Sequence, residues 1–230
     1  LGLPLRWPLG CDPQSLVDCT VGAMTRRGKY LWLPLAPPAS ALHMVFVGMP
    51  DLPEAIENSF SGSGLLIHLG MSGALAFSDA QARGKYDHFR LETDRGTLRL
   101  SDPRRFGAVV WSRSLNDDPA RKLLSSLGPE PFDLSLDGAT FHAALRKRRV
   151  AVKTALLCGE VVVGAGNIYA CEALFVAGID PRTPANRISA PRAGLLLAAL
   201  REVLGRAIDA GGSTLRDFSA NGVGGHYQNA

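Results

Sequence analysis

Residues 101–107, Ser-Asp-Pro-Arg-Arg-Phe-Gly, bring together side chains that can bind nucleic acid. Arg104 and Arg105 place two adjacent guanidinium groups beside the ring of Phe106, after a bend fixed by Pro103. A guanidinium binds phosphate through a rigid fork of donors, and an aromatic ring can wedge between stacked bases. The run therefore predicts a loop tip that enters duplex DNA. By itself it also fits a hairpin turn with solvated arginines and a core phenylalanine.

A glycine-rich stretch from position 159 to position 170 has two interpretations. A strand followed by G-x-G-x-x-x-A, built on Gly164 and Gly166, would bind a dinucleotide and make the protein a nucleotide-dependent oxidoreductase. Against this, no second strand follows, and position 186 lacks the acid that would bind a ribose. In the other interpretation, two helices flank a glycine-rich turn whose N–H groups hold a phosphate together with Asn167, while Lys153 adds positive charge.

The composition indicates an ordered globular protein, since 46% of the 230 residues are hydrophobic and 20% are charged. No apolar run reaches membrane-spanning length and no secretory signal pattern opens the chain, so we expect a cytoplasmic protein without a membrane partner. The net charge is only +4, so local clusters must account for nucleic-acid binding. One acid-free basic cluster fits phosphate binding or a solvated helix end, and its members are Arg146, Lys147, Arg148, Arg149 and Lys153.

The four cysteines, Cys11, Cys19, Cys158 and Cys171, form no C-x-x-C pair and no metal-ligand spacing. In a chain without secretory features we expect buried thiols rather than disulfides, and no metal site. The first residue is Leu1 rather than methionine, so we expect a fragment or a processed product.

The elements that must position these side chains differ between the two halves of the chain. Short apolar runs separated by glycine-rich turns predict strands at 29–33, 65–69, 74–77, 89–93 and 97–100, the last two as a hairpin with one solvated face. After about residue 117, apolar residues recur every three or four positions. This spacing predicts helices at 119–127, 140–146, 167–177 and 190–210.

This order of elements predicts an α+β protein with two domains. An antiparallel β-sandwich is expected over residues 1–116 and a helical domain over residues 117–230. Residues 36–64 are rich in Pro, Gly and Ser, and we expect them to form a long surface loop within the first domain.

Seven motifs between residues 5 and 227 occur in an order that is similar to that of one known family. They are LRWP at 5–8, RGKY at 27–30, HLGMSG at 68–73, DPRRFG at 102–107, LGPEP at 127–131, VGAGNIYA at 163–170 and GGSTLRDF at 211–218. In this order they resemble bacterial formamidopyrimidine-DNA glycosylases, the repair enzymes that excise oxidised purines. Each motif alone is a weak signal, and the specificity of the match comes from their succession.

The resemblance implies a bifunctional DNA glycosylase and apurinic/apyrimidinic lyase. Its second domain would contain a helix–two-turns–helix element, and a basic cleft between the domains would hold double-stranded DNA with an oxidised purine (8-oxoguanine or a formamidopyrimidine) or an abasic site. In that family an N-terminal proline attacks C1′ of the flipped nucleotide, expels the base and forms an iminium that leads to β,δ-elimination, with the adjacent glutamate as acid/base. We expect a monomer associated with the nucleoid.

The resemblance also implies a C-terminal four-cysteine zinc hairpin that helps to hold DNA. No residue of this chain matches that hairpin, the family's proline or its glutamate. We therefore expect a fragment that has little or no glycosylase activity and contains no zinc.

Four residues match family positions at the damaged nucleotide. Lys29 matches the lysine that contacts phosphate and donates a proton in β-elimination. Phe106 matches the residue that wedges into the base stack, Met71 the residue that fills the hole left by the flipped base, and Arg104 the partner of the orphaned opposite base. Refilling the stack offsets part of the few kcal/mol that unstacking costs.

Other matches concern the DNA backbone. The resemblance assigns phosphate contacts to Arg105, His68, Lys153 and Asn167. Arg149 stands where the family usually has a lysine, so the charge is kept and the geometry differs.

Two further parts of the chain correspond to DNA-contacting parts of the family. Tyr86 replaces a histidine that is expected to touch DNA, and a phenol can donate to phosphate but cannot be cationic. Ser219, Gly224 and Tyr227 lie in a segment that resembles the mobile loop closing over the flipped base.

Two alternatives to the repair enzyme stay open. One is a non-enzymatic DNA-binding module that uses the same cleft, and a Met-Pro-Glu start encoded upstream of Leu1 would favour the enzyme over it. The other is the oxidoreductase described above, which micromolar cofactor binding would support.

Overall fold

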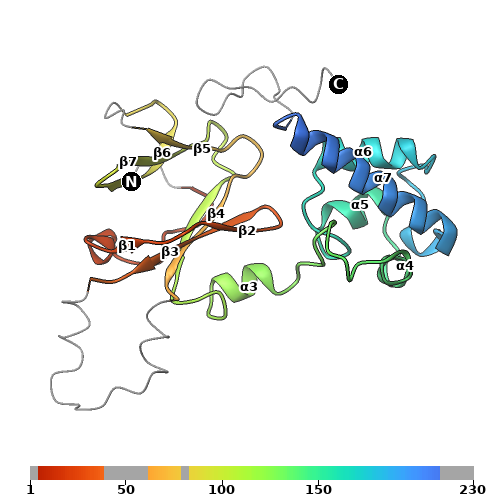
Figure 1. Cartoon of the computed structure of the whole chain (residues 1–230), viewed down its shortest axis with the longest axis horizontal. Coiled ribbons are helices and arrows are strands. Elements are labelled where there is room, and N and C mark those ends of the chain that lie inside the picture. Colours follow the sequence, from red (N-terminus) through yellow and green to blue (C-terminus); the bar gives the residue numbers. More distant parts are fainter. Residues whose placement is uncertain (1–4, 39–61, 79–82, 213–230) are drawn as a thin grey trace, which may run out of the picture. The chain divides into compact units, whose positions relative to one another are not determined.

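The computed structural model describes residues 5–38, 62–78 and 83–212, and the chain divides into two compact units, Leu1–Ser125 and Ser126–Ala230 (Figure 1). Strands dominate the first unit and helices the second, which confirms the predicted α+β class. The division falls after a short helix, α3 (Ala120–Leu124), that packs on a sheet of the first unit.

Two antiparallel sheets make up the first unit. The larger has the order β1 (Thr20–Val21), β3 (Tyr30–Ala36), β4 (Gly64–His68) and β8 (Ala108–Ser112), with β2 (Thr25–Arg27) also paired to β3. The smaller has the order β5 (Ala74–Ser78), β7 (Gly96–Ser101) and β6 (Asp87–Thr93). A 3-10 helix (Pro13–Leu16) precedes β1. The five predicted strands are all present, whereas β1, β2 and β8 are additional.

The two sheets share a hydrophobic core, as expected for a sandwich. Alternate residues of the larger sheet face Phe89 and Leu100 of the smaller one, and they are Leu33, Leu35, Leu65, Ile67 and Val109. The opposite face carries Trp32, Leu66 and Val110, which pack against α3. Strand β4 is thus covered on both sides, which explains why its sequence is continuously apolar rather than alternating.

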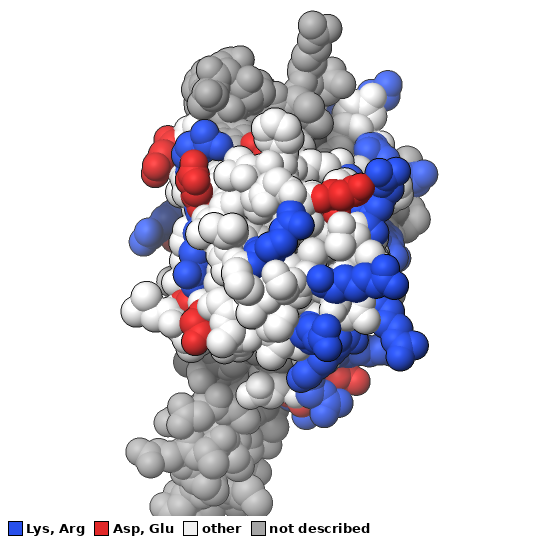
Figure 2. All heavy atoms as spheres, turned by 90° about the vertical axis from the view of Figure 1, so that its right-hand side faces the viewer, with Lys and Arg blue, Asp and Glu red and all other residues white. Residues whose placement is uncertain are grey.

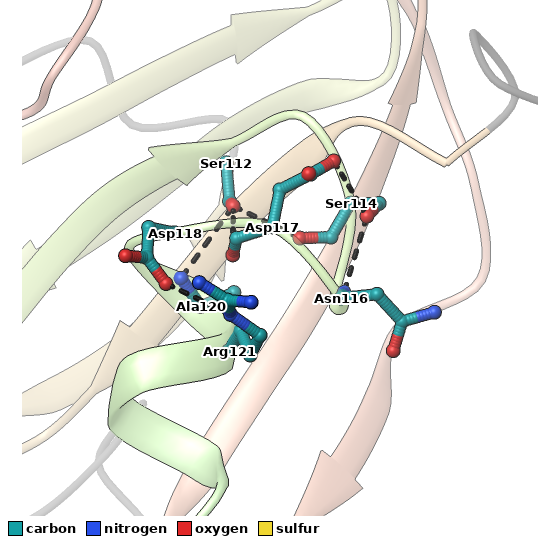
Figure 3. A network of polar contacts seen from close by, with 7 residues as sticks. All are labelled: Ser112, Ser114, Asn116, Asp117, Asp118, Ala120 and Arg121. Carbon is teal, nitrogen blue, oxygen red and sulfur yellow. Dashed lines mark hydrogen bonds and ion pairs between the residues drawn. The ribbon is translucent and has the colours of Figure 1, made fainter.

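The connection from β8 to α3 is held by the buried hydroxyl of Ser112 (Figure 3). The one proton of this hydroxyl is shared between the carbonyl oxygens of Ser114 at 2.9 Å and Asp117 at 3.1 Å, and the oxygen accepts the N–H of Ala120 at 3.5 Å. Ser114 Oγ in turn donates to Asp117 Oδ2 at 2.9 Å. These hydrogen bonds fix the beginning of α3 next to the end of β8.

The second unit is built from α4 (Gly138–Arg146), α5 (Val152–Leu157), α6 (Asn167–Val176) and α7 (Ala190–Asp209), with a 3-10 helix at Ala185–Arg187. Helix α7 packs along α4 and α6, and one face of α7 lies fully inside their common core. The helices predicted at 140–146, 167–177 and 190–210 are confirmed. The one predicted at 119–127 is shorter and ends at Leu124, before serines and a Gly-Pro pair that do not favour a helix.

Turns, not a strand, join α5 to α6. Val161 and Val162 are buried in the helical core, Val163 is buried as well, and Gly159 and Gly164 have φ values of 77° and 87°. Three successive apolar residues are thus buried here without a β partner, since the described part of this unit offers no neighbouring strand. The dinucleotide interpretation needs a strand before the glycines and is therefore wrong.

The Leu-Gly-Pro-Glu-Pro segment at 127–131 supports these turns. The N–H of Gly128 donates to the carbonyl of Gly159 at 2.8 Å, and the N–H of Val163 donates to that of Pro129 at 3.0 Å. A Cβ on Gly128 would lie 2.4 Å from the carbonyl oxygen of Glu160. The glycine is thus required by the close approach of two backbones.

Candidate nucleic-acid interface

Two turns of the first unit carry four of the predicted side chains and are in backbone contact. The Met71 turn (residues 69–73) follows β4, and the arginine loop (residues 102–107) joins β7 to β8. Gly70 has a φ of +66°, and a Cβ on it would lie 2.6 Å from the carbonyl carbon of Phe106 and 2.7 Å from the nitrogen of Gly107. Only glycine fits position 70 without displacing the arginine loop.

Asp102 organises the arginine loop from inside the protein, where it is fully buried. Its Oδ2 accepts the N–H of Gly107 at 2.7 Å, and its Oδ1 accepts the N–H of Arg104 at 3.2 Å and the hydroxyl of Ser72 at 2.5 Å. The four residues between Asp102 and Gly107 are all exposed, whereas these two are buried. The carboxylate therefore holds both ends of the loop while the tip faces outward.

The side chains at the two tips point away from the core. Met71 is 73% exposed and Phe106 is 43% exposed. The guanidinium carbon of Arg104 lies 4.8 Å from the centre of the Phe106 ring, as in a cation–π contact. Arg105 has a φ of 58°, which is uncommon for a residue other than glycine, and strained conformations of this kind cluster at functional sites. The alternative of a core phenylalanine at this turn is wrong.

His68, at the end of β4, is a neutral imidazole with one defined tautomer. Its Nδ1 accepts the N–H of Gly70 at 3.0 Å, so the ring proton lies on Nε2. Burial lowers the pKa of His68 from its ordinary value, and the positive charges of Lys29 and Arg6 lower it further. The ring can therefore donate from Nε2 without carrying a charge.

Lys29 lies beside this histidine, in the turn between β2 and β3. The next residue, Tyr30, pairs with His68 across the two strands, and their ring centres are 4.8 Å apart. The side chain of Lys29 reaches the surface, but the packing around its ammonium group removes part of its water and lowers the pKa of Lys29. A lysine shifted in this direction gives up its proton more readily at neutral pH.

Tyr86 joins the same group through the backbone. Its carbonyl accepts the N–H of Asp102 at 2.9 Å, and its exposed ring has Lys85 Nζ 5.3 Å from its centre. Seven predicted residues are thus gathered in the first unit, and they are Lys29, His68, Met71, Tyr86, Arg104, Arg105 and Phe106.

Three predicted phosphate contacts belong to the second unit. Lys153 is the second residue of α5, Asn167 is the first residue of α6, and Arg149 is exposed before α5. Of the basic cluster, Arg146 donates to a backbone carbonyl at 2.7 Å and Arg148 pairs with Glu160. Figure 2 shows Lys and Arg side chains gathered along one edge of the face it presents, with few Asp or Glu among them.

The structure offers no metal centre in its described ranges, where no three His, Cys, Asp or Glu side chains come together so that they could hold an ion. All four cysteines are free thiols, and the expectation that they are buried is wrong, since Cys158 and Cys171 are exposed and Cys11 and Cys19 half-buried. Cys171 lies on a helix face outside the core, and Cys158 follows the last residue of α5. In the same ranges no helix is long and apolar enough to cross a membrane.

Sequence reasoning missed two residues that this geometry singles out. Ser72 and Asp102 were part of recognised motifs but carried no assigned role, although Asp before Pro is a common turn-forming pair whose carboxylate binds nearby N–H groups. Ser219, Gly224 and Tyr227 lie outside the described residues.

The close approach at Gly70 leads to a stability prediction. Replacing Gly70 with alanine is expected to lower the free energy of unfolding by about 2 kcal/mol more than Gly178→Ala, because the added methyl group must push backbone aside. Gly178 has a similar φ of +62° and nothing within 4 Å of the place a Cβ would occupy, so its substitution carries only the conformational cost of about 1 kcal/mol. Urea unfolding of both variants measures the difference, and equal losses would contradict the backbone contact.

The fold and the site together define a class of protein. The first unit presents an aromatic ring, a methionine and arginines on two adjoining turns. In the second unit, glycine turns start a helix at Asn167. Such features are typical of proteins that bind duplex DNA. A family model described as the formamidopyrimidine-DNA glycosylase N-terminal domain matches residues 4–109, and one described as its H2TH domain matches residues 127–219. The chain belongs to the formamidopyrimidine-DNA glycosylase family.

Sequence identity to known proteins supports this assignment. The chain is 53% identical over 230 residues to a formamidopyrimidine-DNA glycosylase of Acidovorax sp. (strain JS42), with 99% of this chain and 76% of that protein covered. It is 45% identical over 227 residues to that of Bordetella pertussis, with 97% and 74% covered.

Two solved structures show the same fold. The crystal structure of the MutM (Fpg) protein from Thermus thermophilus has a TM-score of 0.74 at 31% identity, with 96% of this chain and 75% of that chain covered. A complex between the Lactococcus lactis Fpg and DNA containing an abasic site has a TM-score of 0.75 at 30% identity, with 94% and 71% covered.

Proposed function

We propose that this chain recognises double-stranded DNA at an oxidised purine or an abasic site, as part of a DNA-repair glycosylase with lyase activity. The observation that carries this proposal is the pair of adjoining turns whose exposed tips bear Met71, Arg104 and Phe106. Exposed apolar side chains that lie beside arginines on two adjoining turns fit a base stack opened by removal of one nucleotide. The relatives' names and the lesion-containing complex support the same conclusion.

The geometry fits a division of labour at the flipped nucleotide. Phe106 wedges between bases, Met71 occupies the space of the everted base, and Arg104 pairs with the base left opposite. Because the guanidinium carbon of Arg104 lies 4.8 Å from the centre of the Phe106 ring, the ring and the guanidinium are presented to the duplex together. Lys29, with its lowered pKa, is the proton donor for β-elimination.

Backbone binding completes the proposal. Arg105 and the neutral Nε2–H of His68 bind phosphate oxygens in the first unit, with Tyr86 as a further donor. Arg149, Lys153 and the start of α6 at Asn167 bind the backbone in the second unit.

Some parts of the proposal rest on the family resemblance alone. These are closure of a loop bearing Ser219, Gly224 and Tyr227 over the base, a zinc-binding four-cysteine hairpin that no described residue is assigned to, a monomeric state and a cytoplasmic location at the nucleoid. No step assigned to the described residues depends on zinc.

The proposal is tested by comparing two duplexes that differ at one position. The 230-residue chain is expected to bind a duplex with a tetrahydrofuran abasic site more tightly than the same duplex undamaged, because no base has to be flipped out of the stack to make room for Met71. Fluorescence anisotropy with both duplexes measures the ratio of the two Kd values. A ratio of one would refute lesion recognition.

The placement of Arg105 gives a second prediction. Arg105→Ala is expected to reduce the slope of log Kd against log salt by about 0.9, the effect of one lost phosphate contact. Arg121→Ala is the control, since this exposed arginine pairs with Asp118 at 3.1 Å and has no proposed phosphate contact. The same slope for Arg105→Ala and the unaltered chain would remove Arg105 from the interface.

A further inference from the structure

The Met71 turn and the arginine loop are joined by one hydrogen bond between side chains. Ser72, next to Met71, donates its hydroxyl proton to Asp102 Oδ1 at 2.5 Å, although thirty positions separate the two residues in the chain. The same Oδ1 accepts the N–H of Arg104 at 3.2 Å. One oxygen atom therefore binds the residue after Met71 and the residue two before Phe106.

The acceptor in this bond is fixed in place. Asp102 is fully buried, its other carboxylate oxygen binds the N–H of Gly107 at 2.7 Å, and its own carbonyl accepts His88 Nε2 at 2.9 Å and the N–H of Arg105 at 3.2 Å. Ser72 is only half-buried and lies in a turn closed by a bond from the N–H of Gly73 to the carbonyl of Leu69 at 2.8 Å. The hydroxyl thus ties the Met71 turn to a rigid point of the arginine loop.

The contact at Gly70 and the bond of Ser72 act on different parts of the Met71 turn. At Gly70 the backbones touch, so the turn cannot move toward the arginine loop. Steric contact does not prevent the middle of the turn from moving away. The strand pairs of His68 with Ala108 and of Ala74 with Ser101 hold the ends of the two turns together, and between those ends the hydroxyl bond of Ser72 opposes such a movement. Met71 itself is 73% exposed and is held in position by its turn rather than by packing.

We propose that Ser72 is a positioning residue that couples the two turns, so that Met71 and Phe106 enter the duplex as one unit. The inference rests on the proposed function, since it concerns how the two inserting side chains act together. Side chains that act as a unit give strongly non-additive effects when they are removed, whereas independent side chains give effects that multiply.

The test is a set of double-mutant cycles on the affinity for a tetrahydrofuran duplex. In the otherwise unaltered chain, Met71→Ala and Phe106→Ala are each expected to weaken binding about tenfold, and the double variant is expected to be less than about threefold weaker than either one. In the Ser72→Ala background the same two changes are expected to multiply, toward roughly a hundredfold. Ser72→Thr, which keeps the hydroxyl, is expected to restore the non-additive result.

The possible outcomes distinguish a failure of the coupling by Ser72 from a failure of the proposed insertion of Met71 and Phe106. One such outcome is an interaction free energy between Met71→Ala and Phe106→Ala that is the same in the unaltered chain and in the Ser72→Ala background. That result would overturn the coupling role of Ser72 and would leave the insertion of Met71 and Phe106 intact. If neither single change alters Kd, the proposed insertion fails and the coupling fails with it. Should Ser72→Ala unfold the chain, Ser72→Cys offers a side chain of similar size with a weak donor, and it is expected to give multiplying effects as well.

Discussion

Replacing Asp102 with alanine is expected to lower the free energy of unfolding by about 3 kcal/mol and to abolish the preference for abasic-site DNA. The change leaves the buried N–H of Gly107 without an acceptor and also frees the N–H of Arg104 and the hydroxyl of Ser72. A buried donor left unsatisfied costs about 1–3 kcal/mol, and the loss of a buried side chain adds to that cost. Urea unfolding measures the stability, and anisotropy with damaged and undamaged duplexes measures the preference.

The control for this prediction is an aspartate with the same local chemistry at the surface. Asp133 Oδ1 accepts the N–H of Ser135 at 2.9 Å and its hydroxyl at 2.8 Å, but this turn is exposed. Asp133→Ala is expected to cost less than about 1 kcal/mol, because water replaces the lost acceptor. Similar losses for the two variants would show that burial of Asp102 does not determine its contribution.

Local pattern was sufficient to predict most elements of this fold. The alternation of Phe89, Leu91, Leu98 and Leu100 with polar residues predicted the hairpin of β6 and β7, because one face of that hairpin lies on the sandwich core. The expectation that the other face is solvated is wrong in part, since His88 and Thr97 on that face are buried. The helical spacing from Ala190 onward predicted α7 for a similar reason, since one face of that helix is buried.

Predictions from the sequence were wrong at places where tertiary contacts determine the local structure. Val161 to Val163 suggested a strand, but these residues are buried without a β partner, and Gly164 at positive φ turns the chain into α6. The same limit applies to Cys158 and Cys171, whose exposure depends on which side of a helix the core occupies. Residue type alone does not contain that information.

The sequence was sufficient to predict the exposed side chains of the two turns, but not the buried residues that hold the turns in place. Arg104, Arg105 and Phe106 stand out by residue type and by a neighbouring proline, and Met71 by a motif. Asp102 gains its role only when the chain brings it to Ser72 and to Gly107, and a fully buried carboxylate is not distinguishable in the sequence from a solvated turn aspartate.

Phe106→Ala is expected to weaken binding to abasic-site DNA about tenfold without a measurable change in stability. Stacking of an aromatic side chain on a base contributes about 1–3 kcal/mol, and that contribution disappears with the ring. The ring is 43% exposed and belongs to no core cluster of the described residues, so its removal leaves no cavity there. Binding to the undamaged duplex is expected to change less than about threefold, since phosphate contacts dominate it.

Phe77→Ala is the matched control, because this phenylalanine lies on β5 of the same unit and is 49% exposed. It lies beyond the end of the Met71 turn in an ordinary strand, so its removal should leave both affinities unchanged. The two variants lose the same surface hydrophobicity, and only the position on the arginine loop differs between them. An equal weakening by both would mean that the effect comes from general apolar contact with DNA, whereas a loss confined to Phe106→Ala and to the damaged duplex requires a ring inserted at the missing base.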